Sequence, residues 1–342
     1  MKVREKGIIV GKLPTGRKNC LTDVAGVMVG HVTLDCPLDE SGEAYACTGV
    51  TAILPHKGNL FKEKVTAASY VINGFGKTTG LVQLNELGVL ESPIMLTNTF
   101  AVPAVTQGVL QYMLEENQEI GETTGTINVV VGECNDSYLN SIRLFPVKPE
   151  HAVEAIKNAS DRQAVEGAVG AGKGMVCFGY KGGIGSSSRI VEEYTVGCLV
   201  QSNFGKKEEL RLFLYPEGEG LSETSDGSII IVLATDAPLS DRQLQRLAKR
   251  CGIGLGRTGS HFSHGSGDIV IAFSTAQKMA HFSEERIETR SQLREDHPIM
   301  NQLFTAAAEA AEEAILNSLS QAGTTKGRAG RVVPQINFLK EE

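Results

Sequence analysis

Short, uninterrupted runs of apolar residues recur along the whole chain and set the strongest limit on its fold. They have the length of β-strands, and many are rich in β-branched residues, which is typical of strands buried on both faces. The runs lie at residues 50–54, 94–96, 127–131, 175–178, 195–200, 210–214, 229–233 and 269–273. We therefore expect sheets that are enclosed on both sides by other layers.

Four segments between these runs have the features of helices. Residues 77–87 stop at Gly88, a residue type common just after a helix, and residues 103–113 begin with a proline. Ser240 opens an S-D-R-Q capping box, and an alanine-rich segment spans residues 300–319. Helices that alternate irregularly with buried strands predict an α/β protein with stacked sheets between helical layers.

The connections between the runs predict part of the strand pairing. Residues 175–178, 195–200 and 210–214 follow one another without a helix long enough to cross over. Parallel neighbours need such a crossover, so we expect antiparallel pairing in this part of the chain.

Composition and charge narrow the classes of function. The 342 residues are 41% hydrophobic and carry a formal net charge of -7, which supports a large core and argues against a nucleic-acid partner. The N-terminus lacks the features of a signal peptide, and no apolar run approaches the ~20 residues of a membrane span. We expect a cytoplasmic protein that does not bind a membrane.

The cysteines and histidines predict neither disulfides nor a metal site. The cysteines are seven in number, scattered and without a C-x-x-C pair, so reduced thiols are expected. The pair His261 and His264 has no third ligand at metal spacing.

Two glycine-rich segments resemble nucleotide-binding loops but lack a required residue. A phosphate loop in NGFGKTTG (73–80) needs glycine at position 71, which is Val71. A dinucleotide fingerprint in GAVGAGKG (167–174) needs glycine where Met175 or Cys177 stands. We therefore expect no nucleotide, metal or other cofactor.

The junction of Gly227 and Ser228, directly before the apolar run 229–233, allows an unusual reaction. A serine hydroxyl can attack the carbonyl before it, and water can then cut the resulting ester. Glycine tolerates the strained backbone that this reaction needs. The product carries a free α-amine on Ser228, with a reference pKa of roughly 8, beside its own hydroxyl. From spacing alone, a simple turn before a strand explains the same residues.

Seven segments resemble the self-processing serine aminopeptidases (peptidase family S58), the group of the L-aminopeptidase/D-esterases and the β-peptidyl aminopeptidases. In the family's order they are NCLTDVAGVMVGHVTL (19–34), PIMLTNTFAVPAV (93–105), VVGECNDSYLNSIR (130–143), GKGMVCFGYKGGIGSSSR (172–189), YTVGCLVQSNFG (194–205), DGSIIIVLATDAPLS (226–240) and RTGSHFSHGSGDIVIAFST (257–275). The resemblance covers residues 7 to about 320. It implies a four-layer αββα sandwich, like the N-terminal-nucleophile hydrolases and related to the ornithine acetyltransferases.

The same resemblance implies how the chain is processed and assembled. One domain of residues 1–342 is cut between Gly227 and Ser228 into an α chain, 1–227, and a β chain, 228–342, which stay associated. Relatives form homo-oligomers, often tetramers of such αβ units.

The resemblance also implies roles for single residues. Ser228 matches the nucleophile that forms the acyl-enzyme, and Asn203 matches the asparagine of the oxyanion hole. Ser266 and Asp268 match a serine–acid pair that supports the nucleophile, with Asp where some relatives carry Glu. Glu133 matches the acid that binds the α-ammonium group of the substrate.

Several of these residues have structural explanations that remain open. Asn203 can be a turn residue, Ser266 and Asp268 can form a β-turn, and Glu133 can pair with Arg143 or Lys173.

The sequence departs from its relatives at Asn135. Some relatives carry an aromatic residue there, often tyrosine, that assists the oxyanion, and Tyr138 is nearby but out of register. Either the Asn135 amide takes this role or the pocket is wider. Lys181 and Arg189 enclose a glycine-rich stretch, where they can order the processing loop, bind a substrate carboxylate or be solvated charges of a flexible turn.

The sequence therefore predicts a self-cleaving aminopeptidase whose partners are small peptides, amino-acid amides or esters. Two alternatives stay open. One is an acyltransferase like the fold relatives that move acetyl between ornithine and glutamate, although their nucleophile is threonine. The other is an uncut, non-catalytic binding protein.

Overall fold

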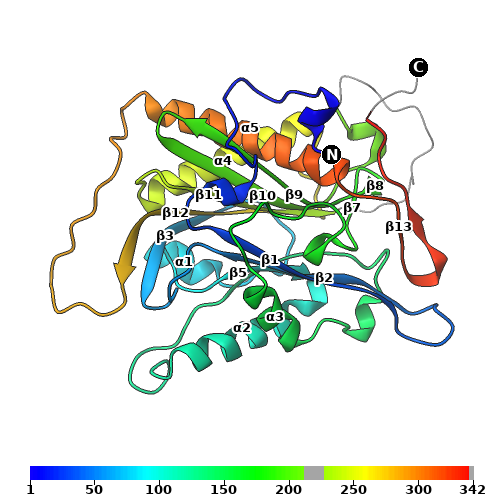
Figure 1. The fold of residues 1–342 in the computed structure, drawn as a ribbon, viewed down its shortest axis with the longest axis horizontal. Helices are drawn as coiled ribbons and strands as arrows, with labels where there is room; N and C mark the ends of the chain where they lie inside the picture. Colours follow the sequence, from blue (N-terminus) through cyan, green and yellow to red (C-terminus); the bar gives the residue numbers. More distant parts are fainter. Residues whose placement is uncertain (212–226, 339–342) are drawn as a thin grey trace.

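Two mixed β-sheets lie face to face between two pairs of helices (Figure 1). The computed structural model describes residues 1–211 and 227–338. Helices α4 (Asp241–Thr258) and α5 (Ile299–Ser320) cover one sheet, and α2 (Val102–Glu116) and α3 (Pro149–Lys157) cover the other. This arrangement confirms the α/β sandwich with αββα layers.

The six-stranded sheet has the order β4-β3-β12-β11-β10-β9. Its neighbouring strands are antiparallel except β11 and β12, which run parallel. The strands are β3 (Glu63–Gly74), β4 (Val89–Leu90), β9 (Gly183–Val191), β10 (Tyr194–Asn203), β11 (Ser228–Thr235) and β12 (Gly267–Ala280).

The four-stranded sheet has the order β1-β2-β5-β6, with only β5 and β6 parallel. Its strands are β1 (Met28–Pro37), β2 (Tyr45–Leu54), β5 (Ile94–Asn98) and β6 (Val130–Cys134). The remaining elements are the strand pairs β7 (Val176–Cys177) with β8 (Tyr180–Lys181) and β13 (Thr325–Lys326) with β14 (Val332–Val333), helix α1 (Leu81–Leu87), and the 3-10 helices Val3–Lys6, Leu21–Asp23, Thr99–Ala101, Ile142–Leu144, Gly170–Gly172, Lys207–Glu209 and Arg328–Gly330.

Strand β11 shows why the apolar runs are continuous. Ile229 and Ile231 belong to the core under α4 and α5, whereas Ile230 and Val232 belong to the core between the sheets. Successive side chains of a strand point to opposite faces, and here both faces are dry. The expectation of strands buried on both sides is therefore confirmed.

The helix predictions are confirmed, with shifted ends: the helix expected over residues 240–251 is α4, which runs on to Thr258. The side chain of Ser240 accepts a hydrogen bond from the Gln243 N–H, which is the predicted capping box of α4. Helix α1 ends at Gly88, which has a left-handed φ of 66°, but it begins at Leu81 rather than at residue 77.

Three strand predictions need correction. Strand β6 begins at Val130 rather than at residue 127, and only residues 176–177 of the run 175–178 form a strand. In the run 210–214, Leu210 and Arg211 lie outside any strand, and residues 212–214 lie outside the described part of the chain. Strand β10 is antiparallel to its neighbours as expected, but these are β9 and β11.

Strand β9 was not predicted, because GIGSSSRIV resembles a polar loop. Its serines are buried, and their hydroxyls find partners inside the protein: the Ser186 hydroxyl donates to the Cys198 carbonyl and the Ser187 hydroxyl to the Ala310 carbonyl. A Cβ at Gly185 would overlap the backbone of α5. Small residues therefore let α5 approach the sheet closely.

None of the described helices is long and apolar enough to cross a membrane.

Candidate active site

Three adjacent strands of the six-stranded sheet bring the predicted catalytic residues to one edge. Strand β10 ends at Asn203, β11 begins at Ser228, and β12 begins at Gly267. The register pairs Asn203 with Ser228 and Ile229 with Asp268. Strand β10 runs antiparallel to β11, and β12 runs parallel to β11. The end of β10 therefore lies beside the beginnings of β11 and β12.

Ser228 lies just below the surface of this edge, with 7% of its area exposed. Its Oγ accepts a hydrogen bond from the backbone N–H of Gly267, at 3.1 Å. A Cβ at Gly227 would overlap the carbonyl oxygen of Asn203, whereas the φ of Gly227 is not positive. Close approach of the two strands, rather than an unusual backbone angle, therefore explains glycine at position 227.

Ser266 and Asp268 form a buried pair beside Ser228. The Ser266 hydroxyl donates to Asp268 Oδ1 at 2.6 Å, so the shorter aspartate side chain does reach its serine. The other oxygen, Oδ2, is buried without a hydrogen-bond partner in the described chain. Burial raises the pKa of Asp268 to about 6, against the opposite effect of the Ser266 hydrogen bond.

The amide group of Asn203 is held from both ends. Its Nδ2 donates to the Asn135 carbonyl at 2.9 Å, and its Oδ1 accepts from the Val176 N–H at 2.8 Å. These two contacts fix which end of the amide is nitrogen. Since an amide nitrogen has two hydrogens, one remains for a ligand.

Glu133 approaches the same edge from β6 of the other sheet. Its carboxylate accepts hydrogen bonds from the Lys77 N–H, at 2.7 Å, and from the Thr99 hydroxyl. A Cβ at Gly76 would lie 3.4 Å from Glu133 Oε1 and 3.8 Å from the Cα of Gly267. Only the backbone at Gly76 therefore separates the carboxylate from the strand that supports Ser228.

The alternative ion pairs of Glu133 are not formed. Lys173 pairs with Asp35 at 2.7 Å, and the exposed Arg143 forms no ion pair with Glu133 in the described residues.

Asn135 and Tyr138 differ in how they relate to this edge. Asn135 contributes its backbone carbonyl, while its side-chain oxygen accepts from the Ser137 N–H at 3.0 Å. The guanidinium of Arg331 lies 4.9 Å from the centre of the Tyr138 ring and donates to the Tyr138 carbonyl. Tyr138 therefore packs against the C-terminal segment.

Sequence reasoning missed the groups that hold Glu133 and Ser228, namely Thr99 and the backbone N–H groups of Lys77 and Gly267. Thr99 follows β5, which pairs in parallel with β6. Because the carboxyl ends of parallel strands meet at one edge, a correct pairing of these two strands is the signal that finds Thr99.

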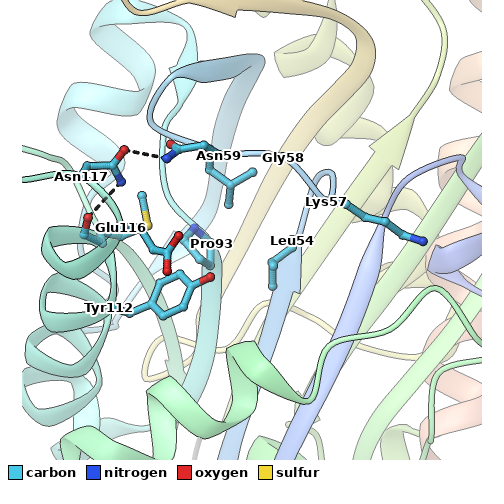
Figure 2. Close-up of a pocket in the computed structure, with 10 residues that line it drawn as sticks. Leu54, Lys57, Gly58, Asn59, Pro93, Tyr112, Glu116 and Asn117 are labelled. Atoms are coloured by element: carbon cyan, nitrogen blue, oxygen red, sulfur yellow. Dashed lines mark hydrogen bonds between the residues drawn. The ribbon is translucent and has the colours of Figure 1, made fainter.

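A separate pocket of about 130 Å³ lies beside β2, β5 and α2 (Figure 2). Leu54, Pro93 and Tyr112 line it, together with Asn59 and Asn117, which are hydrogen-bonded at 2.7 Å. None of the predicted site residues lines this pocket. No group of three or more His, Cys, Asp or Glu side chains suited to a metal occurs in the described residues.

Lys181 and Arg189 are both fully buried, so neither is a solvated charge of a flexible turn or a ligand for a substrate carboxylate. The Lys181 ammonium donates to the carbonyls of Gly172, Met175 and Gly182, at 2.7 to 3.0 Å. Burial lowers its pKa to about 7.

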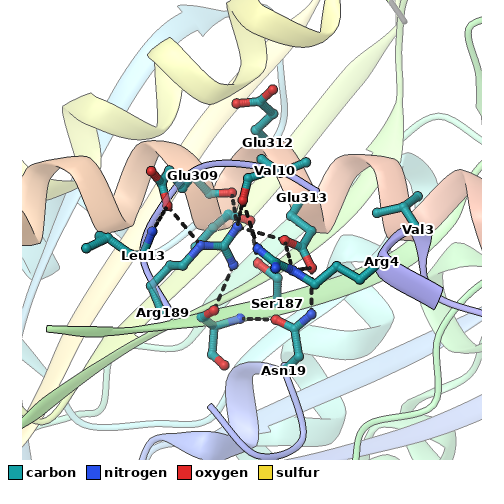
Figure 3. Close-up of polar contacts among 12 residues, drawn as sticks. Val3, Arg4, Val10, Leu13, Asn19, Ser187, Arg189, Glu309, Glu312 and Glu313 are labelled. Atoms are coloured by element: carbon teal, nitrogen blue, oxygen red, sulfur yellow. Dashed lines mark hydrogen bonds and ion pairs between the residues drawn. The ribbon is translucent and has the colours of Figure 1, made fainter. Parts of the chain in front are cut away.

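Arg189 belongs to a buried ionic cluster between β9, α5 and the N-terminal segment (Figure 3). It pairs with Glu309 at 3.1 Å and with Glu313 at 2.7 Å. Glu313 also binds Arg4 and Asn19, as the dashed lines in Figure 3 show. The role of Arg189 is to join distant parts of the fold.

Comparison with known proteins agrees with this fold. The model of peptidase family S58 matches residues 19–333. Among curated proteins, β-peptidyl aminopeptidase BapA of Sphingosinicella microcystinivorans is 40% identical, over 98% of this chain and 89% of its own. Among solved structures, the PH0078 protein from Pyrococcus horikoshii OT3 is 51% identical with a TM-score of 0.90, over 98% of this chain and 96% of its own.

A third relative carries an explicit description of fold and activity. The L-aminopeptidase D-Ala-esterase/amidase from Ochrobactrum anthropi is 33% identical with a TM-score of 0.90, over 98% of this chain and 95% of its own. Its structure is described as a prototype of the serine aminopeptidases and a variant of the Ntn-hydrolase fold. The chain described above thus belongs to peptidase family S58 and is a serine aminopeptidase with this variant of the Ntn-hydrolase fold.

Proposed function

We propose that this aminopeptidase cuts itself between Gly227 and Ser228 and then works through an acyl-enzyme on Ser228. One observation carries the proposal: three adjacent strands bring the predicted catalytic groups together. Asn203 lies at the end of β10, Ser228 at the beginning of β11, and the Ser266–Asp268 pair at the beginning of β12. Together these residues supply a nucleophile, a hydrogen-bond donor for the oxyanion and a carboxyl group.

In the cleavage step, Ser228 Oγ attacks the carbonyl carbon of Gly227 and loses its proton. The bond from that carbon to the Ser228 nitrogen breaks, and the nitrogen takes a proton and becomes an amine. Water then hydrolyses the ester, which leaves a carboxylate on Gly227 and a free hydroxyl on Ser228. The buried Asp268 Oδ2, which has no partner in the described chain, is an acceptor for the new amine.

In turnover, the new α-amine is the base beside its own hydroxyl. It accepts the Oγ proton as Ser228 attacks the substrate carbonyl, and it returns this proton to the leaving amine. The free N–H of Asn203 stabilises the negative oxygen, an interaction worth about 3–4 kcal/mol in comparable enzymes. Water then releases the acyl group from Ser228.

The substrates that we propose are short peptides, amino-acid amides and esters with a free amino end. Glu133 binds the α-ammonium group and so limits the reaction to the first residue. The relatives named as β-peptidyl aminopeptidase and as L-aminopeptidase D-Ala-esterase/amidase support both α- and β-amino acyl groups as candidates.

The cut chains stay together because their strands alternate. Strands β11 and β12 of the β chain lie between β10 and β3 of the α chain.

We further propose a tetramer of such αβ units, as the resemblance to the family implies, acting in the cytoplasm. Native mass measurement of the purified protein tests the assembly, and a monomeric αβ unit would contradict it.

Intact mass under denaturing conditions tests the cleavage itself. We expect two chains whose masses correspond to residues 1–227 and 228–342. A single mass for residues 1–342 in an active preparation would refute the N-terminal-nucleophile mechanism.

Replacing Glu133 with glutamine is expected to lower kcat/KM for an amino-acid p-nitroanilide by about 10- to 100-fold, because a charge-assisted hydrogen bond is worth about 1.5–3 kcal/mol. The N-acetylated form of the same substrate has no ammonium group, so its much lower rate should not change. Glu91→Gln is the matched control, since Glu91 is equally buried but pairs with Lys64. Equal losses on both substrates would contradict the role of Glu133.

The raised pKa of Asp268 predicts a loss of activity in acid. Its carboxylate, which accepts the Ser266 hydrogen bond, is protonated as the pH falls through about 6. The α-ammonium of cut Ser228 favours the carboxylate and moves this transition to lower pH. Protonation of the Ser228 amine, whose reference pKa is roughly 8, lowers kcat/KM first. We expect a second, steeper fall at or below pH 6 from Asp268, and we expect Asp268→Asn to remove only this second step of the acid limb while Asp268→Glu keeps it. An unchanged acid limb in Asp268→Asn would contradict the assignment.

A further inference from the structure

The two contacts that orient the Asn203 amide both come from backbone groups of neighbouring loops. One is the carbonyl of Asn135, just after β6, and the other is the N–H of Val176, in β7. A backbone group can hold an amide in place only if its own loop is fixed. What fixes these two loops therefore decides where the free N–H of Asn203 points.

The loop of Asn135 is fixed by the next residue, Asp136, whose side chain is fully buried. Asp136 Oδ1 accepts a hydrogen bond from Asn140 Nδ2 at 2.9 Å, and its carbonyl accepts the backbone N–H groups of Leu139 and Asn140. Asn140 Oδ1 in turn accepts from the Cys47 N–H of β2. The turn after β6 is thereby attached to the four-stranded sheet.

The loop of Val176 is fixed by Lys181, which pairs with Val176 across the β7–β8 hairpin. The Lys181 ammonium reaches back and donates to the carbonyls of Gly172, Met175 and Gly182. Its three donors are thus used by the loop immediately before Val176 and by the residue after Lys181 itself. The Gly172 and Met175 carbonyls also accept the backbone N–H groups of Met175 and Gly182. The buried ammonium therefore joins three carbonyls of this segment at one point, and a neutral side chain would remove all three contacts.

The two loops also contact each other. A Cβ at Gly174 would lie 2.8 Å from the Cβ of Asp136 and would overlap the Cys47 carbonyl, so the backbone at Gly174 packs directly on both. The charges of Asp136 and Lys181 attract each other, and burial shifts both pKa values to about 7, from below for Asp136 and from above for Lys181. The contact between the two loops is thus made by the backbone at Gly174 rather than by an ion pair of Asp136 with Lys181.

We propose that Asp136 and Lys181 are positioning residues that hold the Asn203 amide with its free N–H directed at the oxyanion. They contact neither Ser228 nor the substrate and act only through the Asn135 carbonyl and the Val176 N–H. This inference rests on the oxyanion role proposed above for Asn203.

A double-mutant cycle on kcat separates positioning from general support of the fold. Asp136→Ala, Asp136→Asn and Lys181→Met are each made in the wild-type and in the Asn203→Ala background. Rates are divided by the fraction of cut chain from intact mass, and thermal unfolding midpoints are recorded. The matched control is the buried pair of Lys2 and Glu166, 2.7 Å apart and without a hydrogen bond to Asn135, Val176 or Asn203 in the described residues, changed to Lys2→Met and Glu166→Gln.

We expect Asp136→Ala and Lys181→Met each to lower kcat by about 10-fold or more, because misplacement of a catalytic group by about 1 Å can cost 10²-fold. KM should change by less than about twofold, since the interaction lost is made in the transition state. In the Asn203→Ala background the same substitutions should cost less than about twofold in kcat. Asp136→Asn, which can still accept from Asn140, should recover most of the rate. The control pair should lower the unfolding midpoint with little effect on kcat.

The outcomes distinguish this inference from the role of Asn203. Wild-type kcat in Asn203→Ala would overturn the oxyanion role and the inference together. A large loss in Asn203→Ala with wild-type kcat in the Asp136 and Lys181 variants would overturn only the inference, as would equal losses in both backgrounds. If Asp136→Ala does not accumulate as folded protein, Lys181→Met carries the same comparison.

Discussion

Replacing Ser228 with alanine is expected to leave one uncut chain of 342 residues and to lower kcat/KM for amino-acid amides by about 10⁴-fold or more. Alanine has no oxygen to attack the Gly227 carbonyl, so neither the cut nor the acyl-enzyme can form. The N-terminal amine that serves as base is lost with the cut. Loss of this one hydroxyl group thus removes nucleophile and base together. Intact mass under denaturing conditions and p-nitroaniline release measure the two effects on the same preparation.

Ser228→Thr and Ser228→Cys are the matched variants for this result. Each keeps a nucleophile at the Cβ of residue 228, so each should still be cut, at a changed rate. A cut Ser228→Ala chain would show that another group or another protein breaks the bond. Full activity in an uncut Ser228→Ala chain would refute the mechanism as a whole.

Replacing Arg189 with methionine is expected to lower the free energy of unfolding by about 3–5 kcal/mol. The methionine fills most of the volume, but Glu309 remains buried without a cation, and Glu313 keeps only its pair with Arg4. The measurement is denaturant unfolding in the Ser228→Ala background, where a single chain unfolds. Exposed ion pairs contribute little, so Arg294→Ala, which breaks the surface pair with Asp296, should cost less than about 1 kcal/mol.

The carboxylates themselves provide the second half of this test. Adding Glu309→Gln to Arg189→Met removes the uncompensated charge and should recover part of the lost stability, because Glu313 stays paired with Arg4. If Arg189→Met alone unfolds no more easily than Arg294→Ala, the cluster does not join β9 to α5 in the way described.

The elements that the sequence predicts correctly are those whose signal is local. The continuous apolar run of β11 and the capping box of α4 each lie within a few residues, and both were found where expected. Strand β9 has no such signal. Its serine hydroxyls donate to the carbonyls of Cys198 and Ala310, and its glycine leaves room for the close packing of α5. Tertiary partners, rather than propensity, make it a strand.

The candidate site also contains features that the sequence predicts and features that depend on the folded chain. The resemblance to a family names Ser228, Asn203 and Glu133, and the fold brings them to one edge. It does not predict that Asn135 contributes a carbonyl rather than its amide, because that depends on the direction of a loop. Nor does it predict the burial of Arg189, whose partners Glu309 and Glu313 are 120 and 124 residues away in sequence.

The proposed cut at Gly227 would leave strands of one chain inserted between strands of the other in the six-stranded sheet, and this has a consequence for how the cut enzyme survives stress. Before the cut, unfolding is unimolecular and the chain can refold by itself. After a cut at Gly227, refolding becomes an encounter of two molecules, and β11 and β12 must insert between β10 and β3. The yield then depends on protein concentration, so the lifetime of the mature enzyme is set by its unfolding rate rather than by an equilibrium. Maturation would thus exchange reversibility for a reactive N-terminus that the folded sheet alone can keep in place.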